Sequence, residues 1–331
     1  NANSLTIYAQ STDPAQMGKL FATGGYDAAG IGGGNGGSGS NITINGGTVT
    51  ATGGDSGAGI GGGNEGSGSD ITINGGSVTA NGGYFAAGIG GGYKGSGSDI
   101  TINGGTVTAN GEQSGAGIGG GMSGHGSDIT INGGSVTANG ASGGAGIGGG
   151  YYGSCSDITI NGGTVTANGG NYAAGIGGGF EGSASDITVA TTLIVKADGN
   201  VITNTGSDLA QLLEGKRYVT IEPAPFSYLA PVYNTEGDPA SGIARWDTLS
   251  CTDYSLVTNT TTTLNAGWYV VTGTDVQTGT LTCNGAVNLI LADGAKLTAT
   301  SGTEENAGIT VSGNANSLTI YAQSTDPAQM G

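Results

Sequence analysis

The sequence predicts an all-β fold: a right-handed parallel β-helix, or β-solenoid, built of 29-residue coils. Two motifs, Ala-Gly-Ile-Gly-Gly-Gly and Ile-Thr-Ile, each recur at a constant 29-residue step. A fixed period of this size is typical of stacked repeat architectures, and crossovers between parallel strands are right-handed. No part of a repeat has the 3.6-residue period of an amphipathic helix. The motifs are marked by Ile31, Ile60, Ile89, Ile118, Ile147 and Ile176, and by Ile42, Ile71, Ile100, Ile129, Ile158 and Ile187.

Each repeat predicts a coil with three short sides and three corners. Residues 42–44 and 48–51 alternate apolar and polar side chains, which indicates two half-buried strands. Asn45-Gly46-Gly47 separates them and is typical of a corner, because Asn and Gly tolerate positive φ. The third side is Ala-Gly-Ile-Gly. We expect Ile31, Ile42, Ile44, Val49 and Ala51 to point inward and Thr43, Thr48 and Thr50 to point outward.

Stacking coils about 4.8 Å apart turns each position of the repeat into a row of near-identical residues. One corner then carries a row of amides, a common way to lock stacked turns together. This predicted amide row is Asn45, Asn74, Asn103, Asn132 and Asn161.

Composition excludes several classes of protein. The chain has 331 residues, of which 74 are Gly, but it lacks the three-residue period of collagen, and its β-branched periodicity is too regular for disorder. Its net charge of −17 argues against nucleic acid or an anionic membrane as partner. No apolar run is long enough to insert into a membrane.

The repeats divide the chain into three parts. Residues 1–222 form the C-terminal part of one β-helix module, with regular coils over 28–189 and a closing cap over 190–222. Residues 223–245 contain several prolines and predict an extended joint between modules. Residues 246–331 predict the cap and first coils of another β-helix module, in which Leu318 follows Leu289 at the same 29-residue step.

The two ends of the chain have the same sequence. Residues 1–18 and 314–331 are identical, at an offset of 313. The order of caps and coils is therefore out of phase with the folding unit, whose natural order is 246–331 followed by 19–222. We expect a tandem array of identical modules of about 313 residues; the alternative is a duplicated segment in a permuted chain.

The repeat units resemble those of glycine-rich repeat proteins on the surface of, or secreted by, anaerobic Gram-positive bacteria. Residues 263–271 and 288–294 are similar to the usual lead-in of that family. The resemblance covers nearly the whole chain. It implies an extracellular or cell-surface location and a structural or adhesive role, and it implies no catalytic residues.

Large aromatic residues occupy two variable corners of an otherwise constant repeat. Exposed aromatic rings beside Asn and Asp suit stacking on sugar rings, and they equally suit packing against a neighbouring module or filament. Because these positions vary while the scaffold repeats, specificity is expected there. The candidate residues for ligand binding or self-association are Tyr84, Phe85, Tyr93, Tyr151, Tyr152, Tyr172 and Phe180.

Two further rows have a functional and an ordinary interpretation. Stacked carboxylates repel one another, so Ca²⁺ could bridge them; alternatively, each accepts hydrogen bonds from corner amides and faces solvent. Rows of Thr resemble ice-binding surfaces, but Ser77 and Ser135 interrupt them, and Thr is common on outward strand faces. The carboxylate row is Asp70, Asp99, Asp128, Asp157 and Asp186, and the Thr array is Thr48, Thr50, Thr106, Thr108, Thr164 and Thr166.

The remaining candidates argue against catalysis. Cys251 and Cys283 could form a disulfide in an oxidising compartment, whereas Cys155 replaces Gly or Ala of other coils and is expected to be a free thiol. His125 is the only histidine, and no nucleophile–base set or metal cluster is recognisable. We therefore expect a non-enzymatic protein without a cofactor, Ca²⁺ aside: a structural module of an extracellular filament, stalk or surface fibre that self-associates end to end. The alternative is an adhesin repeat that binds extracellular polysaccharide or host glycans.

Overall fold

The computed structural model describes residues 4–9, 11, 17–202, 208–233, 243–251, 254–259, 261–301, 307–313 and 315–323. Side chains of residues 226, 231–233 and 243–246 lie outside this description. The chain forms two compact units, Asn1–Pro223 and Ala224–Gly331, here called unit 1 and unit 2. Each unit is nearly all β.

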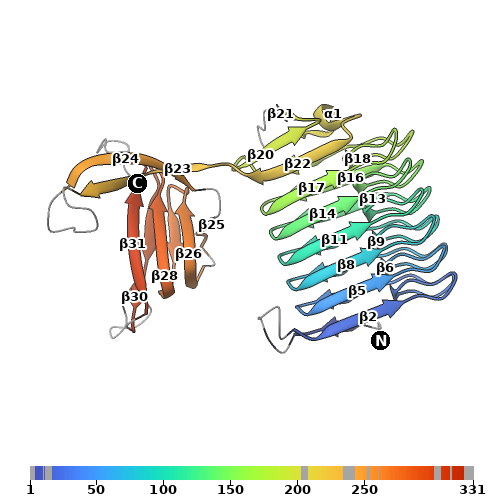
Figure 1. Ribbon diagram of the computed structural model, residues 1–331, viewed down its shortest axis with the longest axis horizontal. Coiled ribbons are helices and arrows are strands. Elements are labelled where there is room, and N and C mark those ends of the chain that lie inside the picture. Colours follow the sequence, from blue (N-terminus) through green and yellow to red (C-terminus); the bar gives the residue numbers. More distant parts are fainter. Residues whose placement is uncertain are drawn as a thin grey trace. The chain divides into compact units, whose positions relative to one another are not determined.

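Unit 1 is a parallel β-solenoid, which confirms the predicted fold class (Figure 1). Successive coils stack in one constant 29-residue register: Ile42 lies opposite Ile71, Val78 opposite Val107, and so on. The first sheet contains β1 (Leu5–Ile7), β4 (Ile42–Ile44), β7 (Ile71–Ile73), β10 (Ile100–Ile102), β13 (Gly126–Ile131), β16 (Cys155–Ile160) and β19 (Ile187–Val189).

The other two sides of each coil build two further sheets. The second sheet begins with β2 (Lys19–Thr23), β5 (Thr48–Thr52), β8 (Ser77–Asn81), β11 (Thr106–Asn110), β14 (Ser135–Asn139) and β17 (Thr164–Asn168). The third contains β3 (Ile31–Gly32), β6 (Ile60–Gly61), β9 (Ile89–Gly90), β12 (Ile118–Gly119), β15 (Ile147–Gly148) and β18 (Ile176–Gly177).

The core of unit 1 is formed by the residues predicted to point inward. Ile44 and Ala51 are fully buried, and Ile31, Ile42 and Val49 are nearly so; their equivalents in later coils behave alike. The strands of the third sheet place glycines of neighbouring coils opposite one another. A Cβ on Gly61 (φ 133°) would lie 2.0 Å from the carbonyl oxygen of Gly90. Only glycine permits this approach between coils.

One end of unit 1 carries a cap whose strand order departs from that of the parallel stack. β20 (Leu193–Ala197) follows β17 at the repeat spacing, yet it pairs with β22 (Tyr218–Pro223), which is inserted antiparallel between β17 and β20. The edge strand is β21 (Asn200–Ile202). Helix α1 (Ala210–Leu213) buries Ala210 and Leu213 in the unit 1 core. The cap thereby ends the parallel stack with antiparallel strands.

Unit 2 begins with a strand pair. β23 (Phe226–Tyr233) and β24 (Ile243–Cys251) are antiparallel partners. The segment predicted as an extended joint, 223–245, therefore contributes to a hairpin of unit 2, although residues 234–242 lie outside the described part.

The rest of unit 2 contains parallel strands with uneven spacing. β25 (Ser255–Leu256), β26 (Thr263–Val271) and β28 (Leu281–Leu291) are successive neighbours, and β28 also pairs with β30 (Ile309–Val311) and β31 (Ser317–Ala322). β27 (Val276–Thr278) pairs with β29 (Leu297–Ala299). The 29-residue step from Leu289 to Leu318 is not the register of these strands: Leu318 lies opposite Val287, and Leu289 lies opposite Ile320.

Candidate functional site

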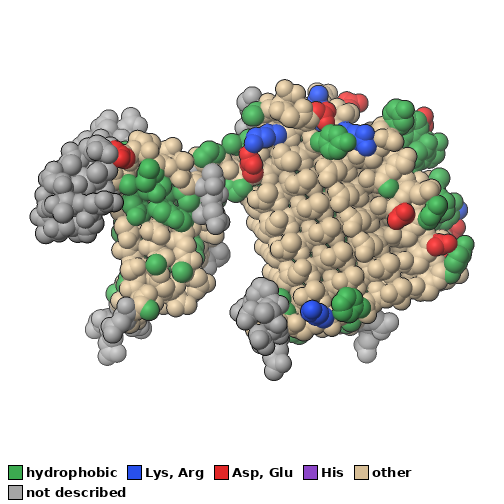
Figure 2. Space-filling view, in the orientation of Figure 1, with side chains coloured by type: hydrophobic (Ala, Val, Ile, Leu, Met, Phe, Trp, Pro, Cys, Tyr) green, Lys and Arg blue, Asp and Glu red, His purple; other side chains and the backbone are tan. Residues whose placement is uncertain are grey.

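The two variable loops of each coil lie along one edge of unit 1. Residues 24–30 and 33–39, with their equivalents at every 29th residue, are here called the loop edge. Backbone hydrogen bonds join each second loop to the first loop of the preceding coil: Tyr93 N donates to Ser56 O (2.9 Å) and Tyr151 N donates to Ser114 O (2.8 Å). On the drawn face, hydrophobic and charged side chains gather at this edge and at the ends of the stack, while the sheet is polar (Figure 2).

Three of the predicted aromatic residues form a first cluster on the loop edge. The Tyr84 and Phe85 ring centroids are 5.8 Å apart, and those of Phe85 and Tyr93 are 5.4 Å apart. The Lys94 ammonium lies 4.9 Å from the centre of the Tyr93 ring and 3.1 Å from the Glu65 carboxylate. The hydrogen bond to Glu65, followed by Tyr93, raises the pKa of Lys94.

The other four predicted aromatic residues form a second cluster. Ring centroids are 4.3 Å apart for Tyr151 and Tyr152, 5.1 Å for Tyr151 and Phe180, and 5.9 Å for Tyr172 and Phe180. The contact between Tyr151 and Tyr152 raises the pKa of Tyr151, mainly by a side-chain hydrogen bond. Tyr152 is 48% exposed and Tyr172 is 86% exposed, so a large part of both rings is open to solvent.

Gly143 makes room for the second cluster. Its φ is 90°, and a Cβ there would lie 2.1 Å from the Tyr151 ring. Its carbonyl oxygen also accepts a hydrogen bond from Phe180 N (2.8 Å). Gly143 stands where other coils have Phe85 or Tyr172. This replacement of an aromatic residue by glycine is the sequence signal for the site, and its meaning is clear only once the position of Tyr151 is known.

A pocket of about 510 Å³ lies beside the second cluster, between the loop edge and the cap. Tyr172, Glu181, Gln211 and Glu214 contribute the large polar or aromatic side chains of its lining. Ring faces, an amide and carboxylates together can stack on a sugar ring and hydrogen-bond its hydroxyls.

The backbone conformation explains why this position of the repeat, the predicted carboxylate row, carries Asp. Asp70, Asp99, Asp128, Asp157 and Asp186 have φ between 50° and 54°, and Asn41, which heads the row, has φ 55°. Among residues with a side chain, Asn and Asp tolerate this left-handed conformation best. The row borders a shallow groove of about 660 Å³ whose other wall is a Thr row including Thr72 and Thr101. Within the described residues, no three His, Cys, Asp or Glu side chains are grouped so as to hold a metal ion.

The predicted amide row forms. Asn74 Nδ2 donates to Asn45 Oδ1 (2.7 Å), and the pattern continues through Asn103, Asn132 and Asn161. A second amide row, not predicted, runs along the end of the second sheet. It comprises Asn81, Asn110, Asn139 and Asn168, with distances of 2.8 Å. The shared 29-residue step is the signal that could have found it.

The single histidine belongs to a structural row as well. In this row a serine hydroxyl accepts from the backbone N–H of the next coil, as Ser96 Oγ does from His125 N (3.2 Å). His125 Nδ1 then replaces the hydroxyl and accepts from Ser154 N (3.0 Å). His125 thus substitutes for a serine in the scaffold.

Cys251 and Cys283, which the sequence offered as a possible disulfide pair, are buried in separate clusters, and the structure has no disulfide between them. Cys155 is a free, buried thiol as predicted, and desolvation by burial raises its pKa to about 12. A thiol with this pKa is protonated and unreactive at neutral pH.

The Thr array proposed for ice binding lies on the outward face of the second sheet. Its members are in parallel register, Thr106 opposite Ser77 and Ser135, so serine interrupts the row as the sequence indicates.

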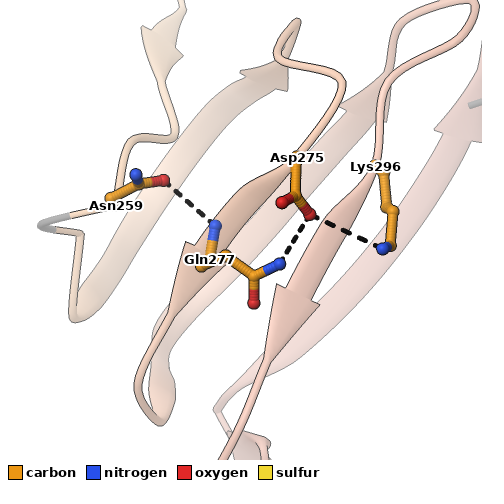
Figure 3. A network of polar contacts seen from close by, with 4 residues as sticks. All are labelled: Asn259, Asp275, Gln277 and Lys296. Atoms are coloured by element: carbon orange, nitrogen blue, oxygen red, sulfur yellow. Dashed lines mark hydrogen bonds and ion pairs between the residues drawn. The ribbon is translucent and has the colours of Figure 1, made fainter.

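Unit 2 contains a small polar network (Figure 3). Asp275 Oδ1 lies 3.5 Å from Lys296 Nζ and accepts from Gln277 Nε2 (2.5 Å), while Gln277 N donates to Asn259 Oδ1 (3.0 Å). Because Asp275 and Lys296 are both more than 60% exposed, this network links β27 to its neighbours and carries no argument for a reaction site.

Comparison with known families agrees with the architecture. Five stretches of unit 1 match the family model described as Beta helix repeat, and each starts at an Ile-Thr-Ile strand. No curated protein and no solved structure matches the chain significantly. In the described residues, no helix is long and apolar enough to span a membrane. Unit 1 is a β-helical repeat structure, matched over residues 42–64, 71–93, 100–122, 129–151 and 158–180.

Proposed function

We propose that the chain is a structural repeat module of an extracellular filament, stalk or surface fibre. The observation that carries this proposal is the constant register of the three sheets of unit 1, in which every regular coil pairs with the next at the same 29-residue step. Rows of isoleucine inside and of amides at the corners make each coil an identical support for its neighbour. Such a stack is stiff along its axis, because each coil is bonded to both neighbours.

Two further features support this role. The scaffold side chains are small and polar outside, and the net charge is −17, which favours solubility at high local concentration. The resemblance to glycine-rich surface proteins supports an extracellular location.

The test combines intact mass with negative-stain microscopy of material from the natural source. We expect a polypeptide many times 31.7 kDa, or rods with a regular axial repeat. Globular particles of a single 31.7 kDa chain would contradict the proposal. Protease treatment of intact cells tests the location, since a surface fibre is cleaved while cytoplasmic markers stay intact.

A second candidate function is saccharide binding at the second aromatic cluster. The exposed rings of Tyr152 and Tyr172 and the adjoining pocket favour it. The matched experiment compares Tyr151→Ala/Tyr152→Ala with Tyr26→Ala, which removes a 75% exposed Tyr from another coil of the loop edge. Saturable binding to a polysaccharide panel that is lost only in the double variant supports this function. Equal binding by both variants, or none by the wild type, excludes it.

A further inference from the structure

Every asparagine of the two amide rows is followed by glycine. In an Asn-Gly pair, the glycine nitrogen can attack the side-chain Cγ of its own asparagine, because glycine has no side chain to hinder the approach. The scaffold therefore presents the same reactive dipeptide at every step of two different rows. The first amide row is Asn45, Asn74, Asn103, Asn132 and Asn161, and the second is Asn81, Asn110, Asn139 and Asn168.

The contacts between side-chain amides are alike in the two rows. Asn103 Nδ2 donates to Asn74 Oδ1 (2.7 Å) in the first row, and Asn110 Nδ2 donates to Asn81 Oδ1 (2.8 Å) in the second. In both rows this bond polarises the side-chain carbonyl and stabilises the negative charge that develops on Oδ1 when a nitrogen attacks Cγ. Because the rows share this feature, a difference in their reactivity must come from the backbone.

In the second row, the Asn-Gly peptide unit is held on both sides by the sheet. Asn110 is the last residue of β11, and its carbonyl oxygen accepts a hydrogen bond from Gly82 N (2.8 Å). Gly111 N donates to Asn139 O (2.8 Å). In a parallel strand ψ is about +115°, which turns the next backbone nitrogen away from the residue's own side chain. Attack on Cγ would need a rotation about the Cα–C bond that breaks both hydrogen bonds.

In the first row, the Asn-Gly peptide unit lies at a corner, beyond the end of the strand. Asn74 N donates to Ile44 O (2.8 Å), but in the described part of the chain no group donates to Asn74 O or accepts from Gly75 N. Asn74 is exposed, whereas Asn110 is partly buried. This peptide unit can therefore turn toward its own side chain without breaking a hydrogen bond between coils. The same arrangement recurs at Asn103 with Gly104 and at Asn132 with Gly133.

We propose that Asn74, Asn103 and Asn132 are self-modification sites, at which the folded chain converts asparagine to aspartate and isoaspartate, while the second row stays intact. The glycine nitrogen gives its proton to solvent and bonds to Cγ, and the bond between Cγ and Nδ2 breaks, so that ammonia leaves and a five-membered cyclic imide remains. Water then adds to one imide carbonyl. Cleavage at Cγ gives aspartate, and cleavage at the main-chain carbonyl gives isoaspartate. One water is consumed and one ammonia is released.

The conversion changes the row in which it occurs. When Asn103 becomes an acid, Asn74 Oδ1 loses its donor and faces a carboxylate instead. Two neighbouring conversions would place carboxylates one coil apart, about 4.8 Å, where they repel each other. Isoaspartate also lengthens the main chain at the corner. The first amide row therefore loses its bonds as the protein ages, while the second row continues to join the coils. This inference concerns the stack of unit 1 itself and does not depend on the fibre function.

The experiment incubates the whole 331-residue chain at pH 8, once in native buffer and once in denaturing urea. Peptide mapping by mass spectrometry measures the change from amide to acid at each asparagine, and a protein isoaspartate methyltransferase labels isoaspartate. In native buffer, the first row should convert at least about tenfold faster than the second, because the second must first open locally. In urea the two rows should convert at similar rates. The positions compared are Asn74, Asn103 and Asn132 against Asn81, Asn110 and Asn139.

Gly75→Ala tests the attacking atom at one site of the row. The added Cβ would lie 3.3 Å from Asn45 O, a contact that a small shift relieves, and far-UV circular dichroism checks the fold. The methyl group hinders the attack, so conversion at Asn74 should slow severalfold, while Asn103 and Asn132 of the same molecule keep their rates. The proposal is overturned if the native wild-type chain converts both rows equally, if the first row converts only in urea, or if Asn74 reacts as fast in Gly75→Ala as in the wild type.

Discussion

Unit 1 and unit 2 both stack parallel strands, but the register of the strands and the residues that hold them together differ. In unit 1 every pairing between regular coils has the same 29-residue step. In unit 2 the step changes along the chain: Thr263 lies opposite Thr282, a step of 19, and Leu281 lies opposite Ile309, a step of 28. A constant step places like beside like, so Gly and Asn can be used again in every coil of unit 1.

Unit 2 cannot use rows of this kind and relies on large side chains. Tyr228 of the hairpin packs on Trp268 of β26 and Tyr321 of β31, with ring centroids 4.8 to 5.2 Å apart. The hairpin thereby covers Val270 and Ile290 on the outward side of the parallel strands. The difference indicates that unit 1 depends on close backbone approach and unit 2 on aromatic packing.

The largest expected effect is on backbone approach in unit 1. In Gly90→Ala the new Cβ would lie 2.0 Å from Gly119 O at a φ of 130°, so we expect a loss of about 3 kcal/mol or more. The matched variant is Gly279→Ala in unit 2, where nothing lies within 4 Å of the added methyl group, and its effect should stay within about 0.5 kcal/mol. Urea unfolding followed by far-UV circular dichroism measures both, and equal effects would contradict the comparison.

The reverse contrast concerns aromatic residues. Trp268→Ala should destabilise unit 2 by about 2–4 kcal/mol, because it removes a half-buried ring from the Tyr228 and Tyr321 cluster. Tyr172→Ala removes an 86% exposed ring from unit 1 and should change stability by less than about 0.5 kcal/mol.

Hydrogen-exchange protection of β28 reports the stability of unit 2, and protection of β11 reports that of unit 1. Trp fluorescence would not serve here, because both Trp residues lie in unit 2 and Trp268→Ala removes one of them. Loss of protection in β11 rather than β28 on Trp268→Ala would show that the aromatic cluster does not support unit 2.

A smaller effect is expected for the amide rows. Asn110 donates to Asn81 and accepts from Asn139, and it is partly buried, so Asn110→Asp loses one donor and should cost about 1–2 kcal/mol. Asn284 makes one exposed amide contact, to Asn265 at 3.2 Å, and Asn284→Asp should cost about 0.5 kcal/mol or less. Thermal melts of the two variants distinguish these values, and a larger loss for Asn284→Asp would refute the ladder argument.

The smallest effect at neutral pH concerns Cys155. Its pKa is raised to about 12 by burial, so the folded state retains the proton longer than the unfolded chain. The resulting stabilisation is complete below about pH 9 and is lost as the pH rises toward 12. A thiol reagent at pH 8 should label Cys155 only on unfolding, and Cys155→Ala should flatten the alkaline fall in stability of unit 1. Rapid labelling of the native protein would contradict this burial.

The sequence predicts unit 1 well because its spacing maps directly onto structure. The 29-residue step between isoleucines is also the register between strands, so inward rows and the Asn74 amide row follow from arithmetic. The antiparallel insertion of β22 does not follow, because the alternation of residues 218–222 specifies a strand without its direction or partner. In unit 2 the steps between paired strands are uneven, so the 29-residue spacing of Leu289 and Leu318 differs by two positions from the observed register, in which Leu318 lies opposite Val287.

The sequence identifies the residues of the candidate surfaces, but it does not show which of these residues lie together. The sequence places Tyr93 and Phe85 at two different corners, and only the hydrogen bonds between loops of neighbouring coils show that these corners adjoin. The carboxylate row is recognisable from the repeat, but its cause, the left-handed backbone at residues such as Asp99, is a conformation that sequence spacing does not reveal.

The hydrogen bonds of the loop edge have a consequence for how this chain can evolve. They join backbone atoms alone, as between Asn64 N and Asp27 O, so these bonds do not depend on the side chains at the variable loop positions. A gene encoding such coils can gain, lose or exchange one 29-residue cassette by unequal recombination and still produce a folded product. Each such event changes the side chains displayed on the loop edge, while the three sheets that support them stay the same.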